Sequence, residues 1–177
     1  MENIRFVPAP LKINFSEIGE DDEKYKREFD KLVSSDEDSV GQWLKLAKAR
    51  GETSESDQVV LNLVVELHRK IDDLTAYIKD EKPTYLDLKY EKDVESIGFE
   101  HFKLQDGELK LDKRYYGRIL MPVFPKREFP IFFKAINENI AEIVLMHEPD
   151  VKDWSSYMSA RERVMIREAK ALKEEKR

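Results

Sequence analysis

The chain has 177 residues, of which 41% are hydrophobic and 38% charged, and its 37 acidic and 31 basic residues give a formal net charge of -6. This is enough apolar material for one or two small globular domains, and the acidic balance disfavours non-specific binding to nucleic acid. The lack of cysteine excludes disulfides, thiol nucleophiles and thiolate metal sites.

The sequence also argues against several other classes of protein. No apolar run reaches about 18 residues and no basic segment precedes a hydrophobic stretch, so we expect neither a transmembrane span nor a secretory signal, and a cytoplasmic address. His68, His101 and His147 are scattered, and no phosphate-cradling glycine pattern occurs. We therefore expect a protein that is not an enzyme and has no metal site and no resident cofactor.

Residues 1–55 are predicted to form a helical N-terminal appendage. It opens with an extended segment around Pro8 and Pro10, followed by a helix with Tyr25, Phe29 and Leu32 at helical spacing. A second short helix is expected from near Ser39 to Gly51.

Residues 56–80 are predicted to form a long helix with a heptad pattern. Ser56 or Asp57 can cap its start, and Pro83 requires it to end upstream. Six apolar residues recur at alternating steps of four and three: Val60, Val64, Leu67, Ile71, Leu74 and Ile78. Such a stripe, here called the seam, ordinarily packs on the equivalent stripe of another helix, which predicts a homo-oligomer.

An alternative remains open for this helix, because most amphipathic helices pack on their own domain. Further apolar residues, at Leu61, Leu63, Val65 and Tyr77, widen the stripe beyond a two-helix contact. That width fits a bundle of more than two helices, or contact with partner helices and the chain's own barrel together.

Residues 84–177 are predicted to form a small antiparallel β-barrel or sandwich closed by a C-terminal helix, which makes the fold class α+β. Apolar and polar residues begin to alternate at Thr84, and five or six short strands follow one another. The expected strands are 84–90, 97–104, 115–121, 129–136 and 141–146. The closing helix is expected over 153–176, capped by Asp153 or Ser155, with Trp154 plugging the end of the barrel.

The order of heptad helix, barrel and closing helix resembles the PilZ domain family, whose members are receptors for the dinucleotide cyclic di-GMP. Residues 93–102 stand where that family has an Asp/Asn-x-Ser-x-x-Gly strand, with Asp93, Glu95 and Gly98 at the three motif positions. Residues 109–133 resemble the family's hairpin, and residues 154–166 resemble its closing helix. The branch that it most resembles is oligomeric, with a heptad helix ahead of the barrel.

The departures from the family pattern concern ligand binding. Family members that bind the dinucleotide carry Arg-x-x-x-Arg upstream of the strand motif, whereas Lys79 to Lys92 supplies only lysines, which lack the planar grip of a guanidinium. Glu95 replaces the motif serine, and a like charge at about 4 Å costs roughly 4 kcal/mol at an effective dielectric constant of about 20. Binding of cyclic di-GMP through this site is expected to be weak or absent.

Arg114 and Arg118 do have the Arg-x-x-x-Arg spacing, but they follow the strand motif. On a strand, residues four apart face the same side, so the pair forms either surface salt bridges or a displaced phosphate site. The segment from Met121 to Phe133 likewise reads either as a hairpin with core aromatics or as an exposed docking surface.

These observations predict an oligomeric PilZ-like adaptor that acts through protein contacts. The resemblance implies a role in motility, with a partner in flagellar or pilus machinery at the cytoplasmic side of a membrane-embedded motor. The alternative is a genuine cyclic di-GMP receptor with a non-standard site that uses Asp93, Gly98 and unconventional cations such as Lys82, Lys89, Arg114 or Arg118.

Overall fold

The computed structural model describes residues 5–19, 22–32, 39–79, 85–123 and 126–175. The chain forms two compact units, residues 1–33 with 86–177 (the barrel unit) and residues 34–85 (the helical unit). The fold is α+β, as predicted. The described helices are α1 (Glu23–Lys31), α2 (Ser39–Ala49), α3 (Gln58–Ile78) and α4 (Glu148–Glu175). The described strands are β1 (Val7–Glu17), β2 (Tyr90–Ile97), β3 (His101–Leu104), β4 (Arg114–Met121), β5 (Arg127–Ala135) and β6 (Ile140–Met146).

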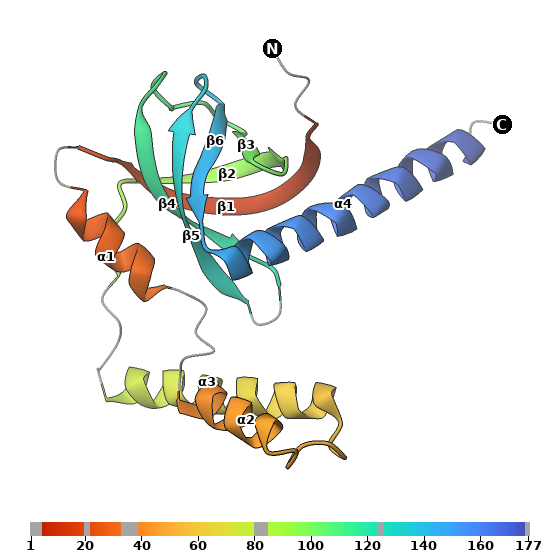
Figure 1. Ribbon diagram of the computed structural model, residues 1–177. Coiled ribbons are helices and arrows are strands. Elements are labelled where there is room, and N and C mark those ends of the chain that lie inside the picture. Colours follow the sequence, from red (N-terminus) through yellow and green to blue (C-terminus); the bar gives the residue numbers. More distant parts are fainter. Residues whose placement is uncertain (1–4, 20–21, 33–38, 80–84, 124–125, 176–177) are drawn as a thin grey trace. The chain divides into compact units, whose positions relative to one another are not determined.

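The six strands close into an antiparallel barrel in the order β1-β2-β3-β6-β5-β4 (Figure 1). Strand β1 completes it, because it pairs with β2 on one side and with β4 on the other. The predicted barrel is therefore confirmed, but its first strand precedes the helical unit in sequence. Residues 34–85 are thus inserted between the first two strands of the barrel.

The expectation that residues 1–55 form a helical appendage is wrong for β1. Its odd-numbered residues face the core, and they are Val7, Ala9, Leu11, Ile13 and Phe15. Pro8 and Pro10, around which an extended segment was expected, face outward, and the pairing of β1 with β2 shifts register between Pro8 and Leu11. A proline lacks an N–H, and this irregularity accommodates two of them in an otherwise regular strand.

The strand predicted over 84–90 is wrong for residues 85–89, and β2 instead covers Tyr90–Ile97, between that segment and the strand predicted over 97–104. The alternation from Thr84 correctly indicated which side chains are covered, since Leu86 and Leu88 are partly buried, but strand pairing starts only at Tyr90. The predicted start of the barrel domain at residue 84 and the predicted end of the long helix at residue 80 lie outside the described residues.

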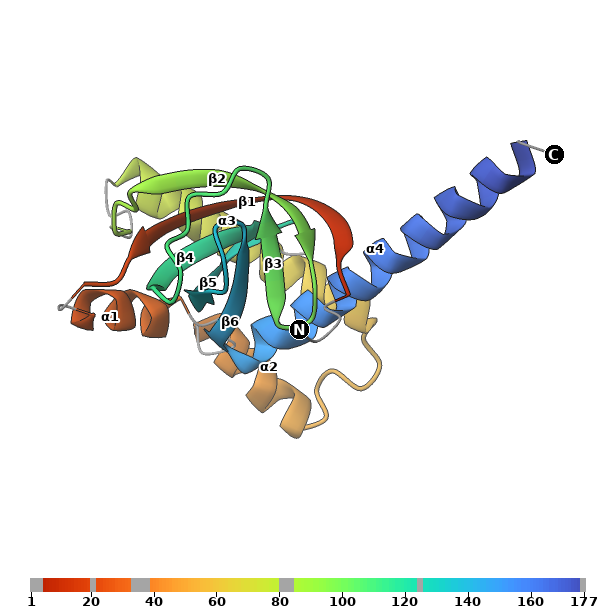
Figure 2. The same cartoon turned by 90° about the horizontal axis from the view of Figure 1, so that it is seen from above.

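Helix α4 closes the barrel, and it begins five residues earlier than predicted. It starts at Glu148 and carries Pro149 in its first turn, where a proline costs no helical hydrogen bond. Trp154 and Met158 are buried in the barrel core, and Trp154 Nε1 donates to the carbonyl of Gly98 at 2.9 Å. The helix packs along β1 and then continues past the barrel (Figure 2).

The helical unit contains α2 and α3. Asp57 caps α3, because its Oδ1 accepts hydrogen bonds from the N–H groups of Val59 (2.8 Å) and Val60 (3.2 Å). This choice of Asp57 over Ser56 agrees with one of the two predicted caps. At about 1.5 Å per residue, the 21 residues of α3 span about 31 Å.

Candidate functional site

The residues predicted from the PilZ resemblance are not gathered into one site. Asp93 and Glu95 are exposed on β2, and the Glu95 carboxylate lies 2.8 Å from Nζ of Lys103. Arg114 and Arg118 lie on β4, and β1 stands between β2 and β4. The acidic and basic halves of the predicted site are therefore separated by a strand.

Gly98 has a role in the fold. It is buried after the end of β2, where its N–H donates to the carbonyl of His101 at 2.7 Å and its own carbonyl accepts from Trp154. Both backbone groups are thus engaged within the protein, one in the turn between β2 and β3 and one by the closing helix.

Arg114 and Arg118 share the outer face of β4, as expected for strand residues four apart. Arg114 is exposed, but Arg118 is 8% exposed because α1 covers this part of the barrel. The surface salt bridge predicted for Arg118 is therefore a buried ion pair. Its partner, Glu28 of α1, is 90 residues away in sequence and was not predicted.

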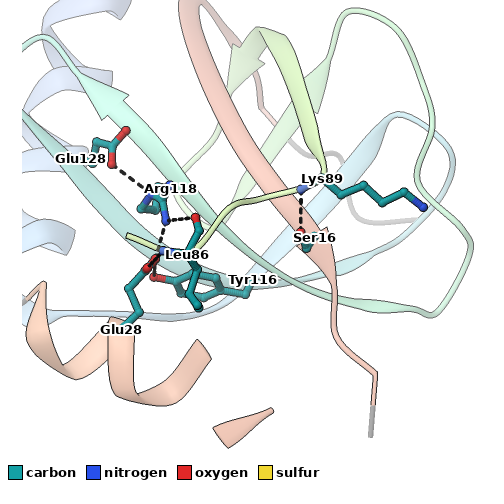
Figure 3. Close-up of polar contacts among 7 residues, drawn as sticks. All are labelled: Ser16, Glu28, Leu86, Lys89, Tyr116, Arg118 and Glu128. Atoms are coloured by element: carbon teal, nitrogen blue, oxygen red, sulfur yellow. Dashed lines mark hydrogen bonds and ion pairs between the residues drawn. The ribbon is translucent and has the colours of Figure 1, made fainter. Parts of the chain in front are cut away.

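Five residues form what we call the Glu28 cluster, drawn in Figure 3 together with Ser16 and Lys89: Glu28, Leu86, Tyr116, Arg118 and Glu128. Glu28 Oε1 accepts from the Tyr116 hydroxyl at 2.8 Å and from Arg118 Nη1 at 2.5 Å, and its Oε2 accepts from the backbone N–H of Leu86. Arg118 Nη1 also donates to the carbonyl of Leu86 at 3.1 Å, and Arg118 Nε lies 3.0 Å from the Glu128 carboxylate.

An apolar layer surrounds this polar cluster. Tyr25 and Phe29 of α1 pack on Tyr116 and Phe132, with ring centroids 5.2 Å apart in both the Tyr25–Tyr116 and the Phe29–Phe132 pair. Leu86 and Leu88 pack against the same layer. The low local dielectric constant strengthens the ion pair and makes the loss of either partner costly.

The cluster holds Tyr116 and Arg118 in fixed protonation states. Burial raises the pKa of Tyr116, and the hydrogen bond to Glu28 and the charge of Glu28 raise it further, so the phenol stays protonated. Burial lowers the pKa of Arg118, but the hydrogen bond and charge of Glu28 and the charge of Glu128 outweigh it, and the net shift is upward. Arg118 therefore stays charged.

This arrangement suits structural support better than catalysis. The Glu28 carboxylate already accepts three hydrogen bonds, so it is poorly placed to take a proton from a substrate. Among the described residues, no group of three or more His, Asp or Glu side chains converges as a metal site requires. No described helix is long and apolar enough to cross a bilayer.

The described part of the segment from Met121 to Phe133 agrees with the hairpin interpretation. Phe129, Ile131 and Phe133 lie in the barrel core, and Phe132 is covered by α1. Phe124 lies outside the described residues. The aromatic side chains seen here are thus core residues, and they offer no docking surface.

The second candidate feature is the seam of α3, which is exposed along its whole length. The exposed fractions of its six residues run from 54% to 75%, and α3 has no buried residue. Leu63 and Tyr77 are exposed as well and widen the apolar face, as expected. Leu61 and Val65, which were expected to widen it too, are partly buried.

The partly covered residues of α3 lie on another face of the helix. They include Leu61, Val65, Arg69 and Ala76, at steps of four, four and seven. At about 100° per residue, the centre of this stripe is about 150° from the centre of the seam. The helix therefore has one partly covered face and, opposite it, a long apolar face that is exposed.

The charged residues of α3 pair along the helix. His68 Nδ1 lies 3.1 Å from the Asp72 carboxylate, and Lys70 Nζ lies 3.7 Å from that of Asp73. His68 thus has the character of a helix-surface polar group.

Comparisons with known proteins add no relative. A scan against protein-family models, a search of curated proteins and a search of solved structures each returned no match.

Proposed function

We propose that this chain is a non-enzymatic, PilZ-like adaptor that assembles into an oligomer through the seam of α3 and so gathers several barrels into one particle. The observation that carries the proposal is the exposure of all six seam residues on one uninterrupted stripe. Burying an exposed side chain of this size is worth about 1–2 kcal/mol, so leaving six of them in water is costly.

The chemistry of the seam favours helix-on-helix packing. In heptad terms, Val64, Ile71 and Ile78 occupy a positions, while d positions hold Val60, Leu67 and Leu74. β-Branched residues at a, with leucine at two of the three d positions, are typical of knobs-into-holes contacts between parallel helices. Exposed Leu63 and Tyr77 flank this seam and fit additional helices.

The partner and the setting come from the resemblance alone. The closed barrel with its C-terminal helix is compatible with a PilZ-like fold, although α3 follows β1 in sequence instead of preceding the whole barrel. The resemblance to that family implies a cytoplasmic role in motility and a partner in flagellar or pilus machinery. The proposal includes poor binding of cyclic di-GMP, since Glu95 is paired with Lys103 and Arg118 is held between two carboxylates. Titration calorimetry with cyclic di-GMP at high micromolar concentration should give no binding heat, and a saturable isotherm would favour a receptor.

Charged substitutions in the seam test whether it mediates assembly. Leu67→Asp with Leu74→Asp should give a particle with the mass of one chain in light scattering, because a carboxylate is expensive to bury unpaired. Asn62→Asp is the matched control, since it adds the same group to an exposed position far from the seam and should leave the mass unchanged. If the double variant keeps the mass of the unmodified protein, the seam does not mediate assembly.

A further inference from the structure

The chain connects the barrel unit to the inserted helical unit at two places, and Glu28 is close to both. Glu28 lies in α1, the last described element before the insertion, and its backbone carbonyl accepts from the N–H of Leu32 at 3.0 Å. Its side-chain carboxylate accepts from the N–H of Leu86, the first residue of the barrel unit after the insertion. One residue thus contacts the chain on both sides of the insertion.

The returning segment is held by side chains before it enters the sheet. Both backbone groups of Leu86 are hydrogen-bonded. Its N–H donates to Glu28, and its carbonyl accepts from Arg118. Three residues later, the N–H of Lys89 donates to the Ser16 hydroxyl at 2.8 Å (Figure 3). Strand pairing with β1 begins only at Tyr90.

The apolar side chains of this segment pack on the same side of the barrel unit as its hydrogen-bond partners. Leu86 and Leu88 pack on the aromatic layer under α1, while Asp87 and Lys89 are exposed. Residues 86–89 therefore make no hydrogen bonds of the β-ladder. They are held by the side chains of Leu86 and Leu88 and by three backbone groups, all of which contact α1, β1 or β4.

We infer that Glu28 and Arg118 form a clamp that fastens residues 86–89 as a strap across α1 and β4, and that this strap opens as one unit without unfolding of the barrel. The clamp attaches the returning chain at Leu86 to the carboxylate of Glu28 in α1, the helix before the insertion, and Arg118 of β4 binds both residues. Local opening of this kind is expected where a segment lacks ladder hydrogen bonds but is bounded by a stable sheet. The inference does not depend on oligomer formation.

Amide hydrogen exchange of the full chain, followed by NMR, tests the strap. In the unmodified protein, Leu86 and Lys89 should show protection factors within about threefold of each other and at least about tenfold below that of Ile13 in β1. If Leu86 and Lys89 exchange as slowly as Ile13, the strap does not open separately and the inference fails.

Two variants separate the clamp from general destabilisation. Glu28→Met removes the acceptor for Leu86, and exchange of Leu86 and Lys89 should accelerate about tenfold or more while Ile131 in the core stays at least about tenfold better protected than Leu86. The control, Glu128→Gln, changes a carboxylate on Arg118 that does not contact Leu86, and it should leave Leu86 exchange within about threefold. Equal acceleration in both variants, or none at Leu86 in Glu28→Met, would overturn the clamp.

Ser16→Ala provides a milder variant should Glu28→Met fail to fold. It removes only the acceptor for Lys89, so a strap that opens as one unit predicts faster exchange at both Lys89 and Leu86. Acceleration confined to Lys89 would contradict a single opening unit.

Discussion

Replacing Arg118 by methionine should destabilise the protein by about 3–5 kcal/mol, because it leaves the buried carboxylate of Glu28 without its cationic partner. Arg118 is 8% exposed and its Nη1 lies 2.5 Å from Glu28 Oε1. A charge pair about 4 Å apart at an effective dielectric constant of about 20 is worth roughly 4 kcal/mol, which agrees with that range. Tyr116 and the Leu86 N–H remain as partners for Glu28, so the cost should not exceed it.

The assay is urea unfolding followed by fluorescence of the buried Trp154, at one fixed protein concentration because assembly would contribute to stability. The single variant Glu28→Met should cost less than Arg118→Met, since Arg118 keeps Glu128. The double variant should be at least about 1 kcal/mol more stable than the sum of the single effects predicts, because neither charge is then left unpaired. A loss below about 1 kcal/mol for Arg118→Met, or simple additivity, would refute the reasoning.

Three further predictions concern the barrel. Gly117→Ala should cost about 1–3 kcal/mol in urea unfolding, because its Cβ would lie 2.9 Å from a backbone oxygen of β1; an unchanged midpoint would contradict this close approach. Trp154→Phe should lower the free energy of unfolding by about 1–3 kcal/mol, because it leaves the buried Gly98 carbonyl unpaired. Unchanged stability would contradict this prediction. Burial raises the pKa of Asp150 although Arg127 opposes the shift, so its contribution to stability is present at acid pH and lost as the pH rises through the folded-state pKa. We compare the free energies of unfolding of the unmodified protein and of Asp150→Asn. The first minus the second should grow as the pH falls toward 4, and the opposite slope would contradict a raised pKa for Asp150.

The sequence predicted the barrel and four helices because their patterns are local. The step of the seam residues, the cap at Asp57 and the alternation within β4 and β5 can all be seen in a short window. Strand β1 shows the same kind of alternation, from Val7 to Phe15, but the segment around Pro8 and Pro10 was predicted only to be extended and to belong to a helical appendage. Their outward orientation and the register shift depend on the partner strand, which no local window contains.

The Glu28 cluster could not be assembled from sequence, because its members come from three distant segments. One signal was present: Glu28 lies among Tyr25, Phe29 and Leu32 on the apolar face of α1, and a charged residue on such a face requires a partner. That partner, Arg118, is identified only by the fold. The same fold separates Asp93 from Arg118, so motif spacing alone suggested a site that the barrel does not assemble.

The central claim is that exposed seams of α3 meet in solution, and the mass of the unmodified full chain tests it most directly. Sedimentation equilibrium over a wide concentration range should give a particle that contains at least two copies of the 20.9 kDa chain. A mass of a single chain at every concentration would contradict the account.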